Sequence, residues 1–443
     1  MDPTPLKLRR AGKTDIPGTF NAGVTLGPVN ETNMVRIWNK HKQTNAPLKR
    51  KVFVGMSGGV DSSVTAALLK ERGFDVRGVH IKMWSDESIP CQFKEDRRDA
   101  LRVAEKLGIP FETWDLTEEY RDEVVNYMIR EYASGRTPNP DVMCNRKIKF
   151  GIFLARALER GADAVATGHY VRREPEFSIG TVGKYIPVGH SEQSEESQRS
   201  RLRQESEILH CVQDDKKNFS TVFENCKLKI AKDLNKDQSY FLWTLTQEQL
   251  THCLFPIGEY TKPEVRALAR SFGLSTAEKP DSQGICFIGE IDLNTYLKKY
   301  IAQTPGRVVT TKGHCIGEHD GFAFYTIGQR AGLKVGGGIP YYVAKKDFQS
   351  NTLVVALGPF DEQLFSRILT AYDAHWIAGI EPILPLTCST RIRYRQPLQS
   401  AVVEQVGDGK VIVRFNEPQR AITPGQSIVF YQNNEMLGGA CIF

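Results

Sequence analysis

The residues best suited to chemistry lie in the segment Ser-Gly-Gly-Val-Asp-Ser-Ser, residues 57–63. A short apolar run precedes this segment, and a helical pattern follows it. Gly58 and Gly59 permit backbone conformations that turn successive N–H groups inward, and the helix N-terminus adds free N–H groups and a positive dipole end. Asp61 could hold Mg²⁺ against bound phosphates, or it could cap the helix. The pattern predicts a cradle for the pyrophosphate portion of ATP in an enzyme that consumes ATP.

This loop differs from two more familiar phosphate loops. It matches neither the Walker sequence G-x-x-x-x-G-K-S/T nor the dinucleotide sequence G-x-G-x-x-G. It contains no lysine, which argues against ordinary transfer of a γ-phosphoryl group. The alternative interpretation is a glycine-serine turn that merely joins a strand to a helix.

A second segment, Thr-Pro-Asn-Pro-Asp-Val-Met-Cys at 137–144, combines an acid with a thiol. Its two prolines predict a rigid turn, and we expect the next helix to begin at Ile148. Cys144 would then lie near a helix N-terminus among basic residues, an environment that raises the thiolate fraction of a cysteine. Asp141 could exchange a proton with the group that Cys144 attacks. The same residues also fit a turn in which the aspartate caps a helix and the cysteine is buried.

A third segment, Gly-Ile-Cys-Phe at 284–287, places Cys286 in a glycine-rich turn. Taken alone, it is an ordinary cysteine. Because it lies far along the chain from Cys144, only the fold or a loop movement could unite the two thiols.

The elements that position these segments alternate between strands and helices from residue 51 to about residue 168. Such alternation predicts a parallel, doubly wound α/β sheet. Residues 1–49 lack sustained periodicity and are expected to be a poorly ordered extension. A polar low-complexity insertion at about 174–226 is expected to be disordered. From about residue 304, short apolar runs between glycine turns predict a β-rich last third.

Composition limits the class of protein further. The chain has 443 residues and a net charge of +6, which is compatible with a polyanionic partner without requiring one. Its nine cysteines include no C-x-x-C pair, so neither a disulfide scaffold nor a zinc site is indicated. No transmembrane run or secretory signal is evident, and a cytoplasmic location is expected.

The Ser-Gly-Gly-x-Asp-Ser loop resembles the pyrophosphatase-type loop (PP-loop) of the ATP α-hydrolases. GMP, NAD and argininosuccinate synthetases, tRNA lysidine synthetase and tRNA thiolases share that loop. Further landmarks are Ala-Thr-Gly-His-Tyr at 166–170, Asn-Lys-Asp-Gln-Ser-Tyr-Phe-Leu at 235–242, Tyr-Thr-Ile-Gly-Gln-Arg at 325–330, Arg-Tyr-Arg-Gln at 393–396 and Thr-Pro-Gly-Gln at 423–426. With the two cysteine segments, they make the chain resemble the tRNA-specific 2-thiouridylase family (MnmA/TrmU type) from about residue 51 to residue 441.

This resemblance implies ATP-dependent thiolation of the wobble uridine in lysine, glutamate and glutamine tRNAs. ATP, with Mg²⁺, would adenylate the C2 oxygen of uracil, and a cysteine persulfide would then deliver sulfur to C2. In the family pattern Cys144 is the nucleophile, Cys286 carries the persulfide and Asp141 handles the proton. The two cysteines can close into a disulfide afterwards. The implied partners are tRNA and a persulfide sulfur-relay protein or cysteine desulfurase, with no role for DNA or a membrane.

The resemblance also carries over contact residues. Those for ATP are Gly55, Met56, Ser57, Gly58, Gly59, Val60, Asp61, Ser62, Ile81 and Gly168. Ile81 stands where the family usually has methionine, which keeps an apolar wall. Those for the tRNA or its target base are Asn139, Pro140, Asp141, His169, Lys236, Asp237, Gln238, Arg393, Tyr394 and Gln426. Each of the tRNA-contact residues could instead be a surface charge or barrel filler.

The implied architecture has an ATP-binding catalytic domain at 50–300, a central β-rich domain at 301–366 and a tRNA-contacting C-terminal β-barrel at 367–443. Two other functions use similar features. An amide-forming ligase related to GMP or NAD synthetase would not need paired thiols. A non-catalytic tRNA-binding protein would not need Asp61, Asp141 and both cysteines.

Overall fold

The computed structural model describes residues 49–86, 93–175, 226–281, 293–333, 340–407 and 409–443. Residues 49–443 form one compact unit. The expected N-terminal extension, nearly all of the 174–226 insertion, and Cys286 lie outside the described residues.

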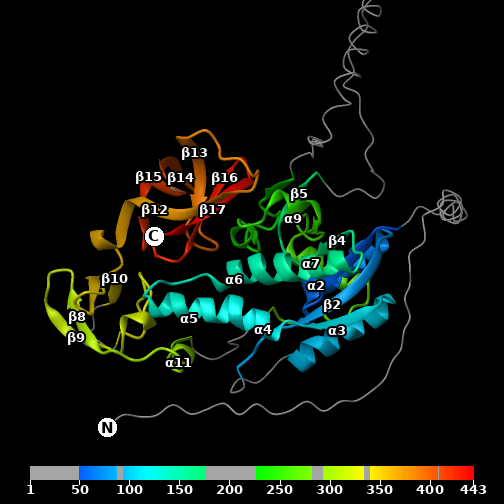
Figure 1. The fold of residues 1–443 in the computed structure, drawn as a ribbon, viewed down its shortest axis with the longest axis horizontal. Helices are drawn as coiled ribbons and strands as arrows, with labels where there is room; N and C mark the ends of the chain where they lie inside the picture. The colour runs from blue at the N-terminus through cyan, green and yellow to red at the C-terminus, as the bar shows by residue number, and fades with distance from the viewer. Residues whose placement is uncertain (1–48, 87–92, 176–225, 282–292, 334–339, 408) are drawn as a thin grey trace, which may run out of the picture. The chain divides into compact units, whose positions relative to one another are not determined.

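The first part of this unit is a five-stranded parallel sheet (Figure 1). Its strands lie in the order β3 (Phe111–Asp115), β2 (Asp75–Lys82), β1 (Lys51–Gly55), β4 (Ala164–Ala166) and β7 (Cys253–Leu254). The chain moves outward from β1 to β2 and β3 on one side, and continues with β4 and β7 on the other. In open α/β sheets, ligands bind beyond the carboxyl ends of the strands at such a reversal of strand order. The ends of β1 and β4 therefore mark the expected site.

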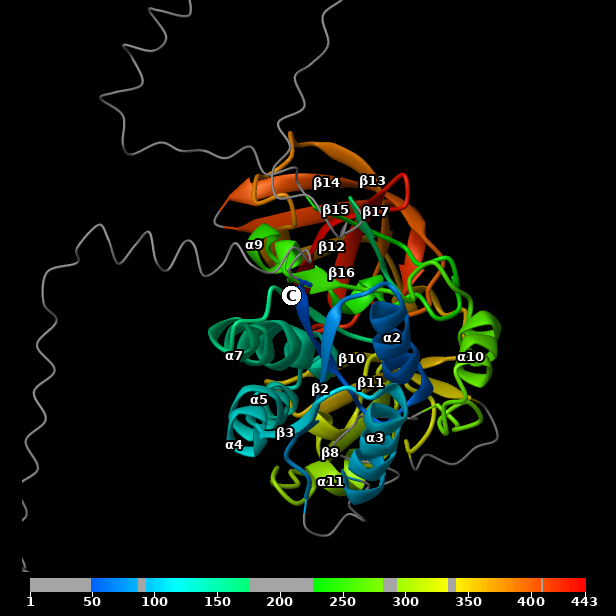
Figure 2. The same ribbon diagram turned by 90° about the vertical axis from the view of Figure 1, so that its right-hand side faces the viewer.

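Helices pack on both faces of this sheet (Figure 2). On one side lie α2 (Val60–Glu71), α3 (Phe93–Leu107) and α10 (Lys262–Ser271), and on the other lies α7 (Phe153–Glu159). Alternate side chains of β1 enter different cores: Val52 and Val54 pack with α2 and α10, whereas Phe53 packs with α7. A central strand buried on both faces confirms the predicted doubly wound α/β fold.

The helix that carries Cys144 begins earlier than the sequence analysis expected. It runs without interruption through α6 (Pro140–Met143), the π-helical segment η3 (Cys144–Ile152) and α7. The side chain of Asn139 accepts a hydrogen bond from Val142 N at 3.3 Å, and Pro140 takes the first helical position. Asn as a cap followed by Pro is a favourable helix start. The expected start at Ile148 is therefore wrong, and Cys144 lies after the first turn.

A similar uninterrupted helical run precedes the Cys144 helix in the chain. It consists of α4 (Thr117–Tyr120), the π-helical segment η2 (Arg121–Val125) and α5 (Asn126–Ala133). Its buried face, which includes Tyr120, Val124 and Met128, packs in one core with strands of the following sheet. This helical run thus joins the five-stranded parallel sheet to the β-rich part of the chain.

The last third of the chain is β-rich, as predicted. A four-stranded sheet has the order β10 (Tyr341–Asp347), β11 (Thr352–Leu357), β8 (Gly306–Thr310) and β9 (Cys315–His319). A closed antiparallel barrel follows, because β12 pairs with both β15 and β17. Its strands are β12 (Phe365–Trp376), β13 (Leu386–Arg391), β14 (Gln399–Gly407), β15 (Lys410–Arg420), β16 (Ser427–Gln432) and β17 (Glu435–Ile442).

Two short strands attach the barrel to the first part of the chain. β6 (Lys227–Lys229) pairs with β17 of the barrel and with β5 (Arg172–Glu174), which follows β4. Glu174 and Lys227, which lie at the two ends of the insertion, pair with each other in these strands. The remaining short elements are η4 (Ser239–Phe241), α9 (Gln247–Thr251), α11 (Leu293–Leu297), η5 (Phe322–Phe324) and η6 (Glu362–Leu364).

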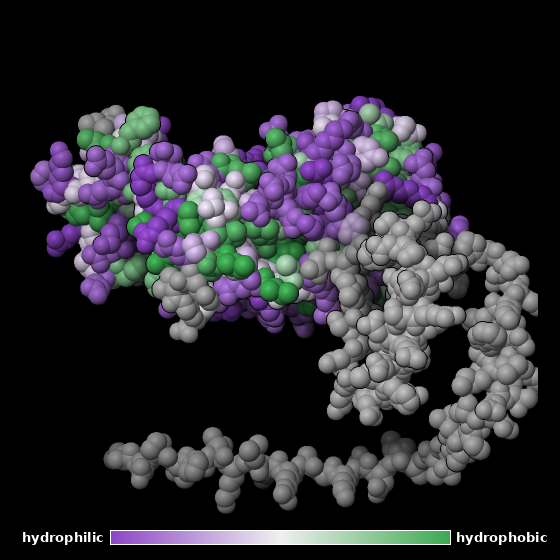
Figure 3. All heavy atoms as spheres, turned by 90° about the horizontal axis from the view of Figure 1, so that it is seen from above, coloured by the Kyte–Doolittle hydropathy of each residue, from purple (hydrophilic) through white to green (hydrophobic). Residues whose placement is uncertain are grey.

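The surface mixes hydrophilic and hydrophobic residues on the face drawn in Figure 3. Among the described residues, no helix combines the length and apolar character needed to cross a membrane.

Candidate active site

The segment at 57–63 forms a tight turn between β1 and α2. Gly58 has a φ of +82°, and a Cβ at this position would lie 2.3 Å from the carbonyl oxygen of Asp96. Gly59 caps α2 with extended backbone and has no side chain to occupy the first N–H groups of the helix. The hydroxyl oxygens of Ser57 and Ser62 lie 3.2 Å apart beside this turn. Uncapped N–H groups, two hydroxyls and the helix dipole together suit a phosphate group.

The loop after β4 closes against this turn. A Cβ at Gly168 would lie 2.7 Å from Ser62 N and 2.9 Å from the carbonyl carbon of Asp61, so the close approach requires glycine. Ile81 lies near the end of β2, which neighbours β1. The residues expected to contact ATP therefore meet at the carboxyl ends of β2, β1 and β4.

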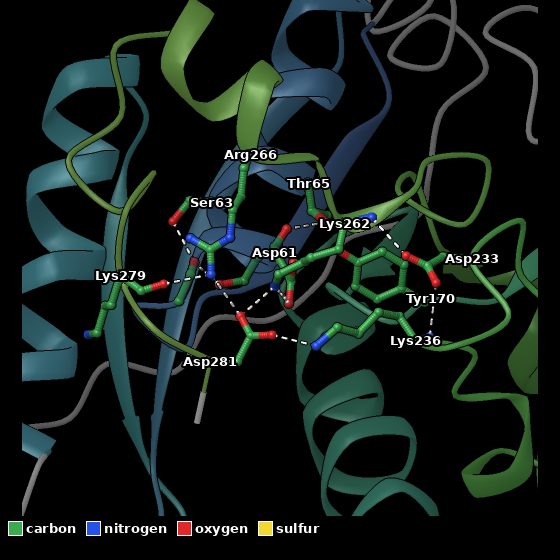
Figure 4. A network of polar contacts seen from close by, with 12 residues as sticks. Asp61, Ser63, Thr65, Tyr170, Asp233, Lys236, Lys262, Arg266, Lys279 and Asp281 are labelled. Atoms are coloured by element: carbon green, nitrogen blue, oxygen red, sulfur yellow. Dashed lines mark hydrogen bonds and ion pairs between the residues drawn. The ribbon is translucent and has the colours of Figure 1, made fainter. Parts of the chain in front are cut away.

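Asp61 is the centre of a polar network (Figure 4). Its carboxylate accepts hydrogen bonds from Lys262 Nζ at 2.8 and 2.9 Å and from the Tyr170 hydroxyl at 2.8 Å. Lys262 Nζ also lies 2.7 Å from Asp281, which in turn contacts Lys236 at 2.6 Å. Burial raises the pKa of Asp281, but hydrogen bonds from Lys236 and Lys262 outweigh it and hold this pKa at about 2.

Cys144 is buried where the helix changes to π-helical geometry. Such irregular turns are frequent at functional sites. Asp141 lies one turn earlier, and burial raises the pKa of its carboxyl group, partly offset by the charge of Lys149. A raised pKa suits a residue that takes up and releases a proton.

His169 joins the two halves of the site. It follows Gly168 directly, and its ring lies 5.8 Å from that of Phe150 on the Cys144 helix. Its Nδ1 is 2.8 Å from the Thr167 hydroxyl. Burial, with a smaller contribution from the Lys149 charge, lowers the pKa of His169 well below its usual value, so the ring is neutral at pH 7. The phosphate turn and the Cys144 helix thus contact consecutive residues of one loop.

The residues expected to contact tRNA fall into two groups. In the first, Lys236 binds Asp281, Asp237 is buried against Arg391 of the barrel at 2.6 Å, and Gln238 accepts a hydrogen bond from the backbone of Tyr170. The Asp237 side chain is completely buried, so only its backbone can face a ligand.

The second group comes from the barrel and surrounds the turn before the Cys144 helix. Gln426 Nε2 donates to the carbonyl oxygens of Thr137 and Pro138, each at 3.0 Å. Arg393 Nη2 donates to Ile327 O and Ala421 O and to the Thr423 hydroxyl. The ring of Tyr394 lies 4.5 Å from that of Phe241. The barrel therefore reaches the segment that contains Asn139 and Asp141.

Sequence reasoning missed Lys262 as part of the site. The residue begins α10, with Thr261 and Glu264 forming a capping box around it. A lysine in the first turn of a helix is unfavourably placed in the field of the helix dipole. This placement was the one sequence feature that could have indicated a role for Lys262. Within the described ranges, no cluster of three or more His, Cys, Asp or Glu side chains could hold a metal ion.

The strand order, the Ser-Gly-Gly-x-Asp-Ser turn and its contacts define a PP-loop nucleotide-binding α/β domain followed by two β domains. Family models agree with this architecture. The tRNA methyl transferase HUP domain matches residues 50–207 and 210–290, its PRC-barrel domain matches 294–357, and an aminomethyltransferase β-barrel domain matches 366–442.

Curated relatives identify the family. Proteins named tRNA-specific 2-thiouridylase MnmA are 44% identical in Legionella pneumophila (89% of this chain, 99% of the relative) and 44% identical in Geobacillus thermodenitrificans (90% and 95%). The relative from Streptococcus sanguinis is 43% identical (89% and 95%). The chain belongs to the tRNA-specific 2-thiouridylase family, which confirms the resemblance seen in the sequence.

Proposed function

We propose that this chain is an ATP-dependent sulfurtransferase that converts the wobble uridine of lysine, glutamate and glutamine tRNAs to 2-thiouridine. The observation that carries the proposal is the pair of consecutive residues Gly168 and His169. The first closes against the phosphate turn, and the second packs beside the Cys144 helix. An ATP site and a helix that carries an acid and a buried thiol, both in contact with one loop, suit activation of a base followed by attack on it.

The reaction has two stages. The uracil C2 oxygen attacks the α phosphate of ATP, and pyrophosphate leaves from the turn at 57–63. The adenylated oxygen is then a good leaving group, as required for a sulfur nucleophile to succeed. The other residues that the family resemblance assigns to ATP contact, including Ile81 and Gly168, would hold the nucleotide.

Sulfur transfer would use both cysteines. The outer sulfur of a Cys286 persulfide attacks C2, and AMP leaves with the former C2 oxygen. The Cys144 thiolate attacks the inner sulfur, which forms a Cys144–Cys286 disulfide and leaves sulfur on C2. Asp141, whose pKa is raised by burial, accepts or returns the proton at this step. A thiol reductant reopens the disulfide, and a sulfur-relay protein or cysteine desulfurase reloads Cys286.

Mg²⁺ would enter with ATP and neutralise phosphate charge. Asp61 is suited to bind it, because the two carboxylate oxygens offer about four acceptor positions and Lys262 and Tyr170 occupy three. Asn139, Pro140 and His169 would line the target base. Lys236 to Gln238, with Arg393, Tyr394 and Gln426, would contact the tRNA. We assign catalysis to residues 50–300 and tRNA contact to a barrel at 367–443, joined by a central domain at 301–366, in a cytoplasmic enzyme.

The test is mass spectrometry of tRNA nucleosides from a strain that lacks this gene. The proposal predicts loss of 2-thiouridine from the three tRNAs and its return when the gene is restored. Unchanged 2-thiouridine in the deletion strain would refute the proposed function.

A further inference from the structure

A lysine from outside the phosphate loop supplies a cation that the loop itself lacks. Residues 55–64 contain no lysine or arginine. Lys262, the first residue of α10, binds both carboxylate oxygens of Asp61, the second residue of α2 (Figure 4). Its ammonium group is therefore held beside the first turn of α2, the turn that we expect to receive the phosphates.

The position of this ammonium group is unfavourable unless its charge has partners. Only 10% of the Lys262 side chain is exposed, and burial of an unpaired ammonium is costly. Asp61 and Asp281 provide the pairing at 2.8 and 2.7 Å, and the Tyr170 ring lies 5.8 Å from Nζ. The side chain is thus held in place by groups from three separate segments.

Lys262 belongs to a network of paired charges. Asp281 also binds Lys236 at 2.6 Å and Arg266 at 3.2 Å. Three basic side chains are thus matched by three carboxylates, because Asp233 also lies here and accepts a hydrogen bond from Lys262 N at 2.9 Å. The attraction of a polyphosphate therefore rests on the ammonium group that is held beside the uncapped N–H groups of α2.

We propose that, when ATP binds, one N–H of the Lys262 ammonium group moves from Asp61 to the pyrophosphate portion of ATP, since Asp61 and Asp281 otherwise use all three of its N–H groups. The ammonium group then stabilises the charge that develops on pyrophosphate as it leaves. It performs the task that a lysine within the loop performs in Walker-type sites. This inference rests on the proposed ATP-dependent function. Asp281 and Tyr170 are positioning residues, since they hold the ammonium and its partner Asp61 in place.

The experiment is calorimetric titration of the full chain with ATP, inorganic pyrophosphate and AMP, each in the presence of Mg²⁺. In Lys262→Gln we expect the Kd values for ATP and pyrophosphate to rise by about 10- to 100-fold, the range for loss of a charge-assisted hydrogen bond. The Kd for AMP should change by less than about 2-fold, because AMP lacks the groups that Lys262 binds. The matched control is Lys232→Gln, which removes an exposed lysine that pairs with Glu264 of the same helix. All three of its Kd values should remain as in the wild type.

The outcomes separate this inference from the proposed function. A wild-type chain that binds neither ATP nor pyrophosphate would refute the proposed function itself. Wild-type binding with unchanged ATP and pyrophosphate affinity in Lys262→Gln would overturn the role of Lys262, and so would equal losses for AMP and ATP. If Lys262→Gln does not fold, the double variant Lys262→Gln/Asp281→Asn removes one charge of each sign and is judged by the same criteria.

Discussion

Asp237 and Arg391 form an ion pair of 2.6 Å between the first part of the chain and the barrel, with both side chains almost fully buried. Asp237 also accepts hydrogen bonds from the backbone of Ala231 and from the Ser239 hydroxyl. Asp237 therefore has a structural role, in addition to being a candidate contact to tRNA. The pair joins two parts of the chain that the proposed reaction must hold together.

Removal of one partner of this pair should destabilise the protein. Asp237→Ala leaves Arg391 buried without its partner, and we expect the free energy of unfolding to fall by about 3–5 kcal/mol. Lys227→Ala is the control, because it breaks a more exposed pair with Glu435 and should cost about 0–1 kcal/mol. Chemical denaturation measures both values. Equal stability of the two variants would contradict the structural role of Asp237.

A methyl group at Gly58 should disrupt the phosphate turn. Gly58→Ala combines a φ of +82° with a clash against Asp96 O, and we expect ATP affinity to fall at least about tenfold through loss of the N–H geometry. Gly73→Ala is a matched control, because its φ is +87° but open space surrounds the new methyl group. It should cost about 1–2 kcal/mol of stability and leave ATP affinity unchanged. Loss of affinity in both variants would refute a specific role for the turn.

Lys346 should make stability depend on pH. Its side chain is buried and donates to Gly135 O at 2.8 Å, and burial lowers its pKa to about 7. Between this pKa and the unfolded value of 10.5, the unfolded chain binds the extra proton, so stability rises with pH across that window. The contribution is at most about 1.4 kcal/mol per pH unit.

The Lys346 contribution is isolated by comparison with a variant. Lys346→Met should remove this rise and be more stable than the wild type near pH 7, whereas Lys345→Met, at an exposed neighbour, should retain it. Denaturant unfolding from pH 7 to pH 10 gives the difference. Parallel profiles for Lys346→Met and the wild type would contradict a depressed pKa.

The carboxyl group of Asp141 should lower the stability of the protein at pH 7 and be required for its activity. Because burial raises its folded pKa above 3.8, its contribution to stability is fully present below about pH 3.8 and is lost as pH rises through the folded value. Asp141→Asn should therefore unfold at a higher temperature than the wild type at pH 7, with the difference shrinking in acid. The same variant should lose thiolation, since an amide cannot exchange the proton. A less stable variant at pH 7 would show that the carboxylate is needed for the fold.

Local patterns made much of the fold predictable. The Ser57–Ser63 turn lies directly after a buried strand and directly before a helix, so composition and periodicity were sufficient. The helix start at Pro140 was also readable, because an asparagine before a proline is a local capping signal. The prolines at 138 and 140 also fit a rigid turn, and that interpretation places the helix start too late, at Ile148.

Contacts between distant segments could not be predicted in the same way. Lys262 and Asp61 are 201 positions apart, and neither segment indicates the other. The same holds for Gln426 and Thr137, which are 289 positions apart. Only the path of the chain through the sheet and the barrel brings such pairs together. The paired roles of Cys144 and Cys286 came from family resemblance alone.

The most direct test of the two-thiol reaction uses purified protein loaded with persulfide, together with ATP, Mg²⁺ and one of the three tRNAs. Wild-type protein should give 2-thiouridine and AMP in equal amounts, measured by mass spectrometry of nucleosides and by chromatography. Cys144→Ser and Cys286→Ser should each give no 2-thiouridine while still binding the tRNA. Near-normal formation of 2-thiouridine by either variant would contradict the account.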